Sequence, residues 1–226
     1  RDYYASRGLG DVYKRQGRHI YKREPSFPIA VACDPAFNFV YEANIRYLHH
    51  LGEVTYFSPL ADTSLPDADF VYLPGGYPEL YLAALSANRQ MLQSIRRYVE
   101  SGGKLLAECG GMMYLCDEIR DKNGDVYPMA GVLHQSATME NMKLRLGYRT
   151  LLYNETRLKG HEFHYSRLVE QQNPLPSCAV AYTAKGVETD TPLYHYKNVW
   201  AGYTHLYWAD PVGNEWFTKF VIDGNT

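Results

Sequence analysis

Short apolar segments alternate with helix-like segments along the first half of this chain, and the alternation limits the folds open to it. Four segments have the length and composition of strands: FPIAVAC (27–33), EVTYFSPL (53–60), DFVYLPGG (69–76) and KLLAE (104–108). Helical spacing of apolar residues lies between and after them, in FNFVYEANIRYLHHLG (37–52), PELYLAALSANRQMLQSIRRYVESGG (78–103) and GMMYLCDEI (111–119). Strands that alternate with helices predict a doubly wound, mostly parallel α/β sheet with helices on both faces.

The second half of the chain has a different pattern. LRLGYRTLLYNETRLKGHEFHYSRLV (144–169) predicts antiparallel hairpins, NVWAGYTHLYWAD (198–210) a further strand and WFTKFVI (216–222) a closing helix. A length of 226 residues suits a single domain, which we expect over 27–226. Residues 1–26 are basic and carry no such pattern, so we expect a leader that is disordered or foreign, on a fragment of a longer protein.

Composition excludes several classes of protein. With 46% hydrophobic residues, 21% charged residues and a formal charge of −2, the chain resembles an ordinary globular protein. It lacks the apolar run of roughly 20 residues that spans a membrane, a signal-peptide core, and a basic stripe for nucleic acid. The four cysteines are scattered without a CxxC pair, so we expect neither a disulfide framework nor a metal site, and a cytoplasmic location.

One cysteine lies where a nucleophile would be expected. Cys109, in AECGGMMYL, follows the fourth predicted strand and opens a predicted helix, the strand–turn–helix arrangement of a nucleophile elbow. A helix N-terminus favours thiolate over thiol, and the glycines Gly110 and Gly111 allow a substrate to approach closely. The Gly110 N–H could also bind a developing oxyanion. Without such neighbours, Cys33, Cys116 and Cys178 are interpreted as structural.

A second donor and a base are needed to complete such a site. LPGGYPEL ends the preceding predicted strand, so Gly75 or Gly76 could supply the second oxyanion N–H. For the base, a thiol usually relies on a histidine that is near in space. Spacing leaves two segments open, GHEFHYS with His161 and His164, and GYTHLYW with His205. Strand alternation would put Glu162, His164 and Ser166 on one face of the first segment.

These segments together resemble the glutamine amidotransferase domain of cobyrinic acid a,c-diamide synthases, within the class I glutaminase superfamily. IAVACDPAFNFVYEANI, FSPLADTSLPDADFVYLPGGYPEL, AECGGMMYL and GHEFHYS are similar to that family's motifs, in the same order, from about Ile29 to Phe217. The resemblance implies a flavodoxin-like doubly wound sheet. It also implies that glutamine is the substrate.

The resemblance assigns roles to individual residues. Cys109 would attack the glutamine side chain and form a thioester, and His205 would act as its base. Gly76 and Gly110 would form the oxyanion hole, with Glu162 and His164 in a second rank near the substrate. Class I glutaminases usually carry a glutamate two residues after the histidine, where this chain has Tyr207. The expected site is therefore a Cys–His dyad, and what aligns His205 stays open, a carboxylate from elsewhere being one answer.

Whole members of that family also carry an N-terminal ATP-binding synthetase domain. This chain has no GxxxxGK[ST] motif, so we expect it to hold the ammonia-producing part alone, with no cofactor of its own. ATP, Mg²⁺ and the corrinoid acceptor would belong to the missing domain.

Four alternatives stay open. Cobyric acid synthase and nickel-sirohydrochlorin a,c-diamide synthase have similar glutaminase halves. The motif AECGGMMYL favours an a,c-diamide synthase over cobyric acid synthase, but it does not distinguish a cobyrinate enzyme from the nickel-sirohydrochlorin enzyme. A DJ-1-like module is a third alternative, although such proteins commonly have a histidine where this chain has Gly110. A non-catalytic docking domain is the fourth.

Overall fold

The central sheet is the predicted doubly wound sheet. A computed structural model describes residues 27–223, so the predicted leader, 1–26, lies outside the described residues. Six strands follow the order β13-β14-β4-β3-β1-β2, and every neighbouring pair is parallel except β13–β14. Their bounds are β1 (Pro28–Ala32), β2 (Glu53–Phe57), β3 (Phe70–Leu73), β4 (Lys104–Glu108), β13 (Leu193–Tyr196) and β14 (Val199–Gly202).

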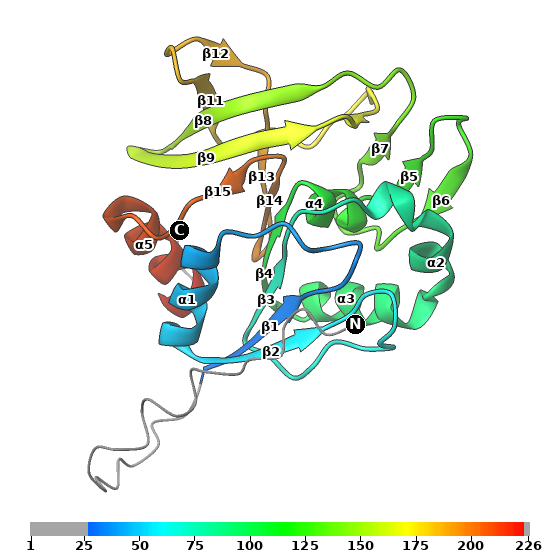
Figure 1. Ribbon diagram of the computed structural model, residues 1–226, viewed down its shortest axis with the longest axis horizontal. Helices are drawn as coiled ribbons and strands as arrows, with labels where there is room; N and C mark the ends of the chain where they lie inside the picture. The colour runs from blue at the N-terminus through cyan, green and yellow to red at the C-terminus, as the bar shows by residue number, and fades with distance from the viewer. Residues whose placement is uncertain (1–26, 224–226) are drawn as a thin grey trace, which may run out of the picture.

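Helices cover both faces of this sheet. On one side are α1 (Glu42–Leu51), α5 (Pro211–Thr218) and the π-helical turn η2 (Lys219–Asp223), and on the other are α2 (Leu82–Ala87), α3 (Arg89–Glu100) and α4 (Gly110–Leu115) (Figure 1). Successive residues of β4 point to opposite faces, so Leu105 packs in the cluster with Met91 and Ile95, and Leu106 in the cluster with Trp208 and Phe217. The alternation of strands and helices predicted both layers correctly.

The long helix predicted over 78–103 is three elements in the structure. A 3₁₀ turn η1 (Pro78–Leu80) comes first, followed by α2 and then α3. The Asn88 side chain accepts a hydrogen bond from the Met91 N–H at 3.4 Å and so caps α3. Asn88 also donates to the carbonyl groups of Pro59 and Asp62, which ties the break to a neighbouring loop.

The helix predicted over 111–119 is also shorter than expected. After α4 the chain enters β5 (Glu118–Arg120), which pairs with β6 (Val126–Pro128) and β7 (Ser136–Thr138). With β10 (Arg167–Leu168) these strands form a small sheet in the order β10-β7-β5-β6. Pairing with distant strands therefore overrides the helical spacing at Glu118 and Ile119.

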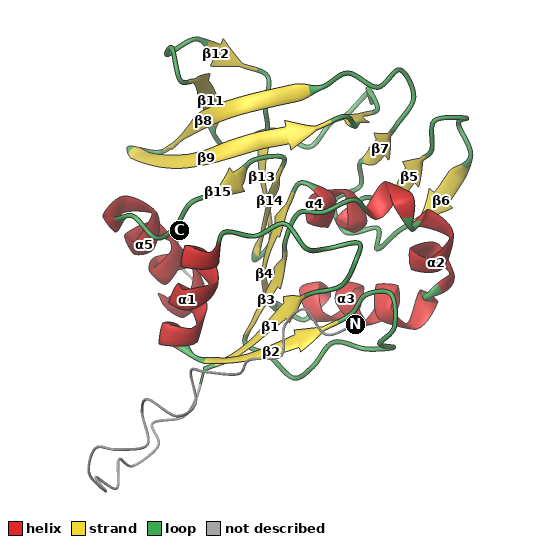
Figure 2. Cartoon of the chain, viewed as in Figure 1, coloured by secondary structure: helices red, strands yellow, loops and turns green. Residues whose placement is uncertain are grey.

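The predicted hairpin region forms a third sheet. β8 (Arg145–Tyr153) and β9 (Thr156–His164) pair over nine residues around a turn at Asn154, where φ is 51°. The sheet continues with β11 (Val180–Thr183), β12 (Glu188–Thr189) and β15 (His205–Leu206) in the order β12-β11-β8-β9-β15. It lies beyond the carboxyl ends of the parallel strands, where α/β sheets bind ligands (Figure 2).

In the part of the chain that the structure describes, no helix combines the length and apolar character needed to cross a membrane.

Candidate active site

Cys109 occupies a strained turn between a strand and a helix. β4 ends at Glu108, α4 begins at Gly110, and Cys109 between them has φ 49° and ψ −107°. A positive φ in a residue with a side chain costs on the order of 1–3 kcal/mol and persists where the surroundings enforce it. Here the Cys109 N–H donates to the Gly202 carbonyl at 2.7 Å, which holds the turn to β14. The local geometry matches the elbow predicted from the sequence.

The two glycine turns lie against each other beside Cys109. A Cβ on Gly110 would be 3.1 Å from the backbone nitrogen of Gly76 and 2.7 Å from Cδ of Pro78. One on Gly111 would be 2.1 Å from the Leu73 carbonyl oxygen. The structure thus brings together the backbone of Gly76 and Gly110, the two residues predicted to donate to an oxyanion, and only residues without a Cβ allow this approach.

His205 lies on β15 with its ring against the first glycine turn. A Cβ on Gly75 would be 2.2 Å from Cε1 of His205, and the Phe39 ring lies 4.4 Å away between centroids. His205 is 3% exposed, and its Nδ1 is buried without a hydrogen-bond partner among residues 27–223. Packing, rather than an acid, therefore holds the ring. Tyr207 packs edge-on against Tyr41 instead.

Cys109 lies at the carboxyl end of β4, and the His205 ring rests against Gly75, just after the carboxyl end of the neighbouring β3; no hydrogen bond joins the two side chains. Sγ of Cys109 donates to the Phe163 carbonyl at 3.6 Å. Phe163 lies on β9, two residues after His161, which pairs with His205. Both residues therefore contact or pair with the same short stretch of β9.

The electrostatic surroundings of Cys109 differ from the sequence-based expectation. Burial, followed by the Glu79 carboxylate, raises the pKa of the Cys109 thiol to about 12, although the Gly110 N–H opposes this. The expectation of a thiolate was wrong for this state, because α4 is six residues long and is outweighed by burial and nearby carboxylates. A protonated thiol also agrees with the bond to the Phe163 carbonyl, which can only accept.

His205 is neutral at physiological pH. Burial, followed by the nearby His161 and His164, lowers its pKa to about 3. A neutral imidazole can accept a proton, as a general base must. The resting site therefore pairs a thiol with a neutral imidazole.

Glu162 and His164 form a buried network of their own. Glu162 is 1% exposed and accepts from Arg149 at 2.5 Å, His164 at 2.7 Å and Thr191 at 2.9 Å. His164 also faces the Ser166 carbonyl through Nδ1 at 2.8 Å. Both of its ring nitrogens are therefore engaged, which leaves neither free to act as a base. The predicted alternation is correct, since residues 162, 164 and 166 are all buried.

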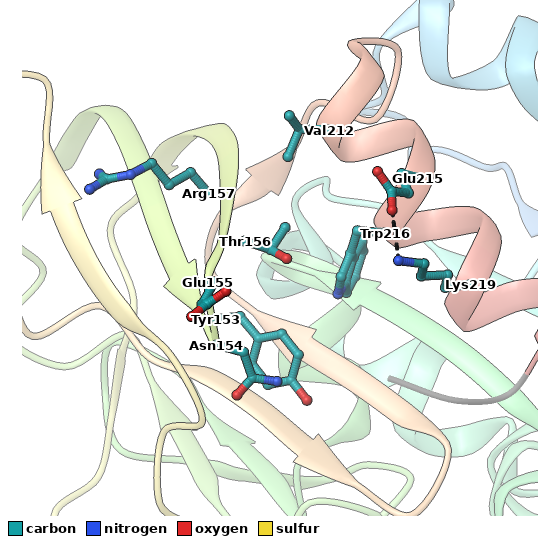
Figure 3. Close-up of a pocket in the computed structure, with 9 residues that line it drawn as sticks. All are labelled: Tyr153, Asn154, Glu155, Thr156, Arg157, Val212, Glu215, Trp216 and Lys219. Carbon is teal, nitrogen blue, oxygen red and sulfur yellow. Dashed lines mark hydrogen bonds and ion pairs between the residues drawn. The ribbon is translucent and has the colours of Figure 1, made fainter.

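Several cavities lie in this half of the molecule, and two of them differ in how close they come to the predicted site. One of about 440 Å³, between the β8–β9 turn and α5, is lined by Tyr153 and Trp216 and by none of the predicted site residues (Figure 3). The other, of about 360 Å³, is lined by Glu162, His164 and Tyr203. The Tyr203 ring stacks on His164 at 3.7 Å, and the second cavity therefore adjoins the network behind Cys109.

Sequence reasoning missed three residues that the structure places in this region. Phe39 packs on His205, Glu79 acts on the charge of Cys109, and the Tyr203 hydroxyl accepts from Ser166 at 3.2 Å. Glu79 lies inside the segment LPGGYPEL, so its proximity to Gly76 was a usable signal. No local pattern marks Phe39, which lies in an otherwise helix-like segment.

Glu108 is the carboxyl group next to the nucleophile, and it is almost fully buried at 1% exposure. Burial raises the pKa of Glu108 to about 8. Hydrogen bonds from the Tyr72 hydroxyl at 2.7 Å and the Leu206 N–H at 3.0 Å lower the pKa, but burial has the larger effect. The group is therefore mostly protonated at neutral pH.

This raised pKa predicts a stability that falls as the pH rises. The folded chain holds a proton on Glu108 that the unfolded chain loses near pH 4.5. The stability that Glu108 contributes is therefore complete below that pH and is lost as the pH rises through about 8. The free energy of unfolding should fall by up to about 1.4 kcal/mol per pH unit in this window, and Glu108→Gln should remove that slope. Urea denaturation of both proteins at several pH values checks this. Equal slopes would contradict it.

Comparison with known proteins shows where this architecture occurs. A family model for the CobB/CobQ-like glutamine amidotransferase domain matches residues 28–212. Hydrogenobyrinate a,c-diamide synthase of Pseudomonas aeruginosa is 40% identical over 185 residues, and cobyrinate a,c-diamide synthase of Fusobacterium nucleatum is 40% identical over 188 residues. Each alignment covers 79% of this chain and 41% of the relative. The chain thus spans about two fifths of these relatives' length.

Solved structures share the fold at low sequence identity. The structure of PurLQS from Thermotoga maritima has a TM-score of 0.55 at 16% identity, covering 88% of this chain and 96% of that chain. The crystal structure of a glutamine amidotransferase has a TM-score of 0.52, also at 16% identity, covering 85% of this chain and 98% of that chain. At this level of sequence identity, the likeness shows a shared fold and nothing further.

Proposed function

Because the chain belongs to the family of CobB/CobQ-like glutamine amidotransferase domains, we propose that it hydrolyses glutamine at Cys109 and delivers the ammonia to an amidation reaction. The observation that carries the proposal is the strained turn at Cys109, beside the backbone of Gly76 and Gly110 and at the same sheet edge as a neutral His205. Acyl transfer needs a nucleophile, a base and paired donors, and these residues can supply them.

The chemistry follows from these positions. His205 takes the proton of the Cys109 thiol as sulfur attacks the side-chain carbonyl carbon of glutamine. The N–H groups of Gly76 and Gly110 stabilise the negative charge on the carbonyl oxygen. The imidazolium then returns its proton to the leaving nitrogen, and ammonia departs from a γ-glutamyl thioester. Water, deprotonated by the same imidazole, cleaves the thioester to glutamate and restores the thiol.

The resting electrostatics predict that the isolated domain is slow. A thiol whose pKa is near 12 does not readily give its proton to an imidazole whose pKa is near 3. Binding of glutamine or of the remaining protein must change the surroundings of the pair before the reaction runs fast. We therefore expect weak glutaminase activity from this chain alone.

The remaining part of the enzyme would perform the amidation. The relatives are named for hydrogenobyrinate or cobyrinate a,c-diamide synthesis, and the chain matches two fifths of their length. We propose that a synthetase domain supplies ATP and Mg²⁺ binding and amidates the a- and c-carboxylates of a corrinoid, in the cytoplasm. Nickel-sirohydrochlorin and cobyric acid pathways are the alternatives for the acceptor.

Exposed apolar side chains near the elbow suit a docking surface for that domain. Phe39 packs on His205, Tyr77 follows Gly76 in the chain, and Tyr165 follows His164. The Leu80 N–H donates to the Tyr77 carbonyl. All four side chains are exposed by 40% or more. Exposed apolar groups gathered around a site are typical of a surface that another domain covers. A domain that covered this surface would lie next to the site and could receive the ammonia directly.

Labelling with a glutamine mimic tests the proposal directly. 6-Diazo-5-oxo-L-norleucine should modify Cys109, and added glutamine should slow the reaction, as peptide mass spectrometry can show. Iodoacetamide is the control, because an unselective reagent should prefer the exposed Cys33 over the buried Cys109. Modification of Cys116 or Cys178 by the glutamine mimic, or none at any cysteine, would count against a glutaminase and favour a DJ-1-like or docking module.

A further inference from the structure

His205 lacks the polar contact that would fix its ring, so its position depends on its backbone. Its Nδ1 has no partner within residues 27–223, and the ring rests on Gly75 and Phe39 by packing. Apolar packing is not directional, whereas a catalytic base must lie within hydrogen-bond reach of its proton. The groups that hold β15 and the residues after it therefore decide where the base lies.

Two buried side chains hold this segment. The Glu108 carboxyl accepts from the Leu206 N–H at 3.0 Å, and Asn44 donates to the Leu206 carbonyl at 2.8 Å. Asn44 also accepts from the Trp208 N–H at 3.0 Å. Glu108 and Asn44 are 1% and 0% exposed, so water cannot readily replace either one.

Glu108 links the two halves of the proposed dyad. It precedes Cys109 directly on β4, and the Leu206 that it binds follows His205 directly on β15. Its other oxygen accepts from Tyr72 on β3, so the carboxyl group is itself held in place from a neighbouring strand. Movement of β15 away from the elbow would lengthen the bond to Leu206.

We propose that Glu108, together with Asn44, is a positioning residue that sets the distance between His205 and Cys109 by holding the Leu206 backbone to the end of β4. The inference rests on the proposed glutaminase function for its kinetic consequences. Its structural claim concerns the place of the His205 ring and stands apart from any activity.

The structural claim is tested by nuclear magnetic resonance of the whole 226-residue chain. The Cε1–H signal of His205, assigned by its loss in His205→Ala, should shift or broaden in Glu108→Ala and keep its position in Glu108→Gln. Glutamine retains an oxygen for the Leu206 N–H, and alanine does not. Tyr72→Phe is the graded comparison: it removes the other bond to Glu108 but keeps the bond to Leu206, and it should shift the signal less than Glu108→Ala does. An unmoved signal in a folded Glu108→Ala protein would overturn the inference.

A kinetic cycle tests the consequence for catalysis. Glu108→Ala should lower kcat for glutamine hydrolysis by about 10-fold or more with KM little changed, because small misplacements of a reacting group are costly. In a His205→Ala background the same change should have almost no further effect, since Glu108 acts through that ring. Additive losses in the two variants would reject the coupling.

A second variant, Asn44→Ala, distinguishes a loss of folding from a loss of His205 positioning. If Glu108→Ala fails to fold, Asn44→Ala should show the same His205 shift and the same fall in kcat, because it releases the same segment. Wild-type activity and spectrum in Asn44→Ala would count against the inference. A wild-type chain with no glutaminase activity and no labelling at Cys109 refutes the proposed function instead, and the resonance measurement still decides the role of Glu108.

Discussion

Cys109→Ala is expected to reduce glutamine hydrolysis to background, a fall of about 10⁴-fold or more, since a covalent mechanism cannot proceed without its nucleophile. The strained backbone at position 109 should persist, because the bond from its N–H to Gly202 does not involve the side chain. The loss would therefore be one of chemistry. Ammonia release, measured with the synthetase portion present and absent, checks the prediction.

Cys116→Ala is the matched control for that experiment. Cys116 is fully buried, and its thiol donates to the Met112 carbonyl at 3.5 Å, away from the glycine turns. It should keep wild-type turnover and lose about 1 kcal/mol of stability, as small buried truncations commonly do. Equal activity of Cys109→Ala and wild type, in a protein that does release ammonia, would eliminate Cys109 as the nucleophile.

His205→Asn is expected to slow labelling by the glutamine mimic and turnover by about 10²–10⁴-fold, the usual contribution of a general base. Asparagine is close to histidine in shape but cannot take the proton. The residue to compare is His164, whose two ring nitrogens are already bonded to Glu162 and Ser166. His164→Asn should therefore cost about 1–3 kcal/mol of stability through the buried Glu162, with a much smaller effect on rate.

The order of these two effects assigns the base. Rates of labelling and free energies of unfolding, measured for both variants under the same conditions, separate a chemical role from a structural one. A large rate loss in His164→Asn with a small one in His205→Asn would exchange the two roles.

Local patterns predicted the secondary structure well where one signal acted alone. The four parallel strands from Phe27 to Glu108, an antiparallel hairpin within 144–169 and the elbow at Cys109 all form as expected. Predictions were wrong where distant contacts compete with local spacing. The helix over 78–103 is broken at Asn88 by bonds to the Pro59 and Asp62 carbonyls, and Glu118 and Ile119 join a sheet.

The sequence by itself determined where a nucleophile could lie and which glycines could approach it, because an elbow and its glycines are encoded within a few consecutive residues. Spacing could not choose among His161, His164 and His205, nor set the charge on Cys109. Only the tertiary structure decided that the thiol is protonated, that His164 is engaged elsewhere and that Glu108 holds Leu206, 98 residues away. Burial and hydrogen bonding between distant segments control these properties, and neither exists until the chain has folded.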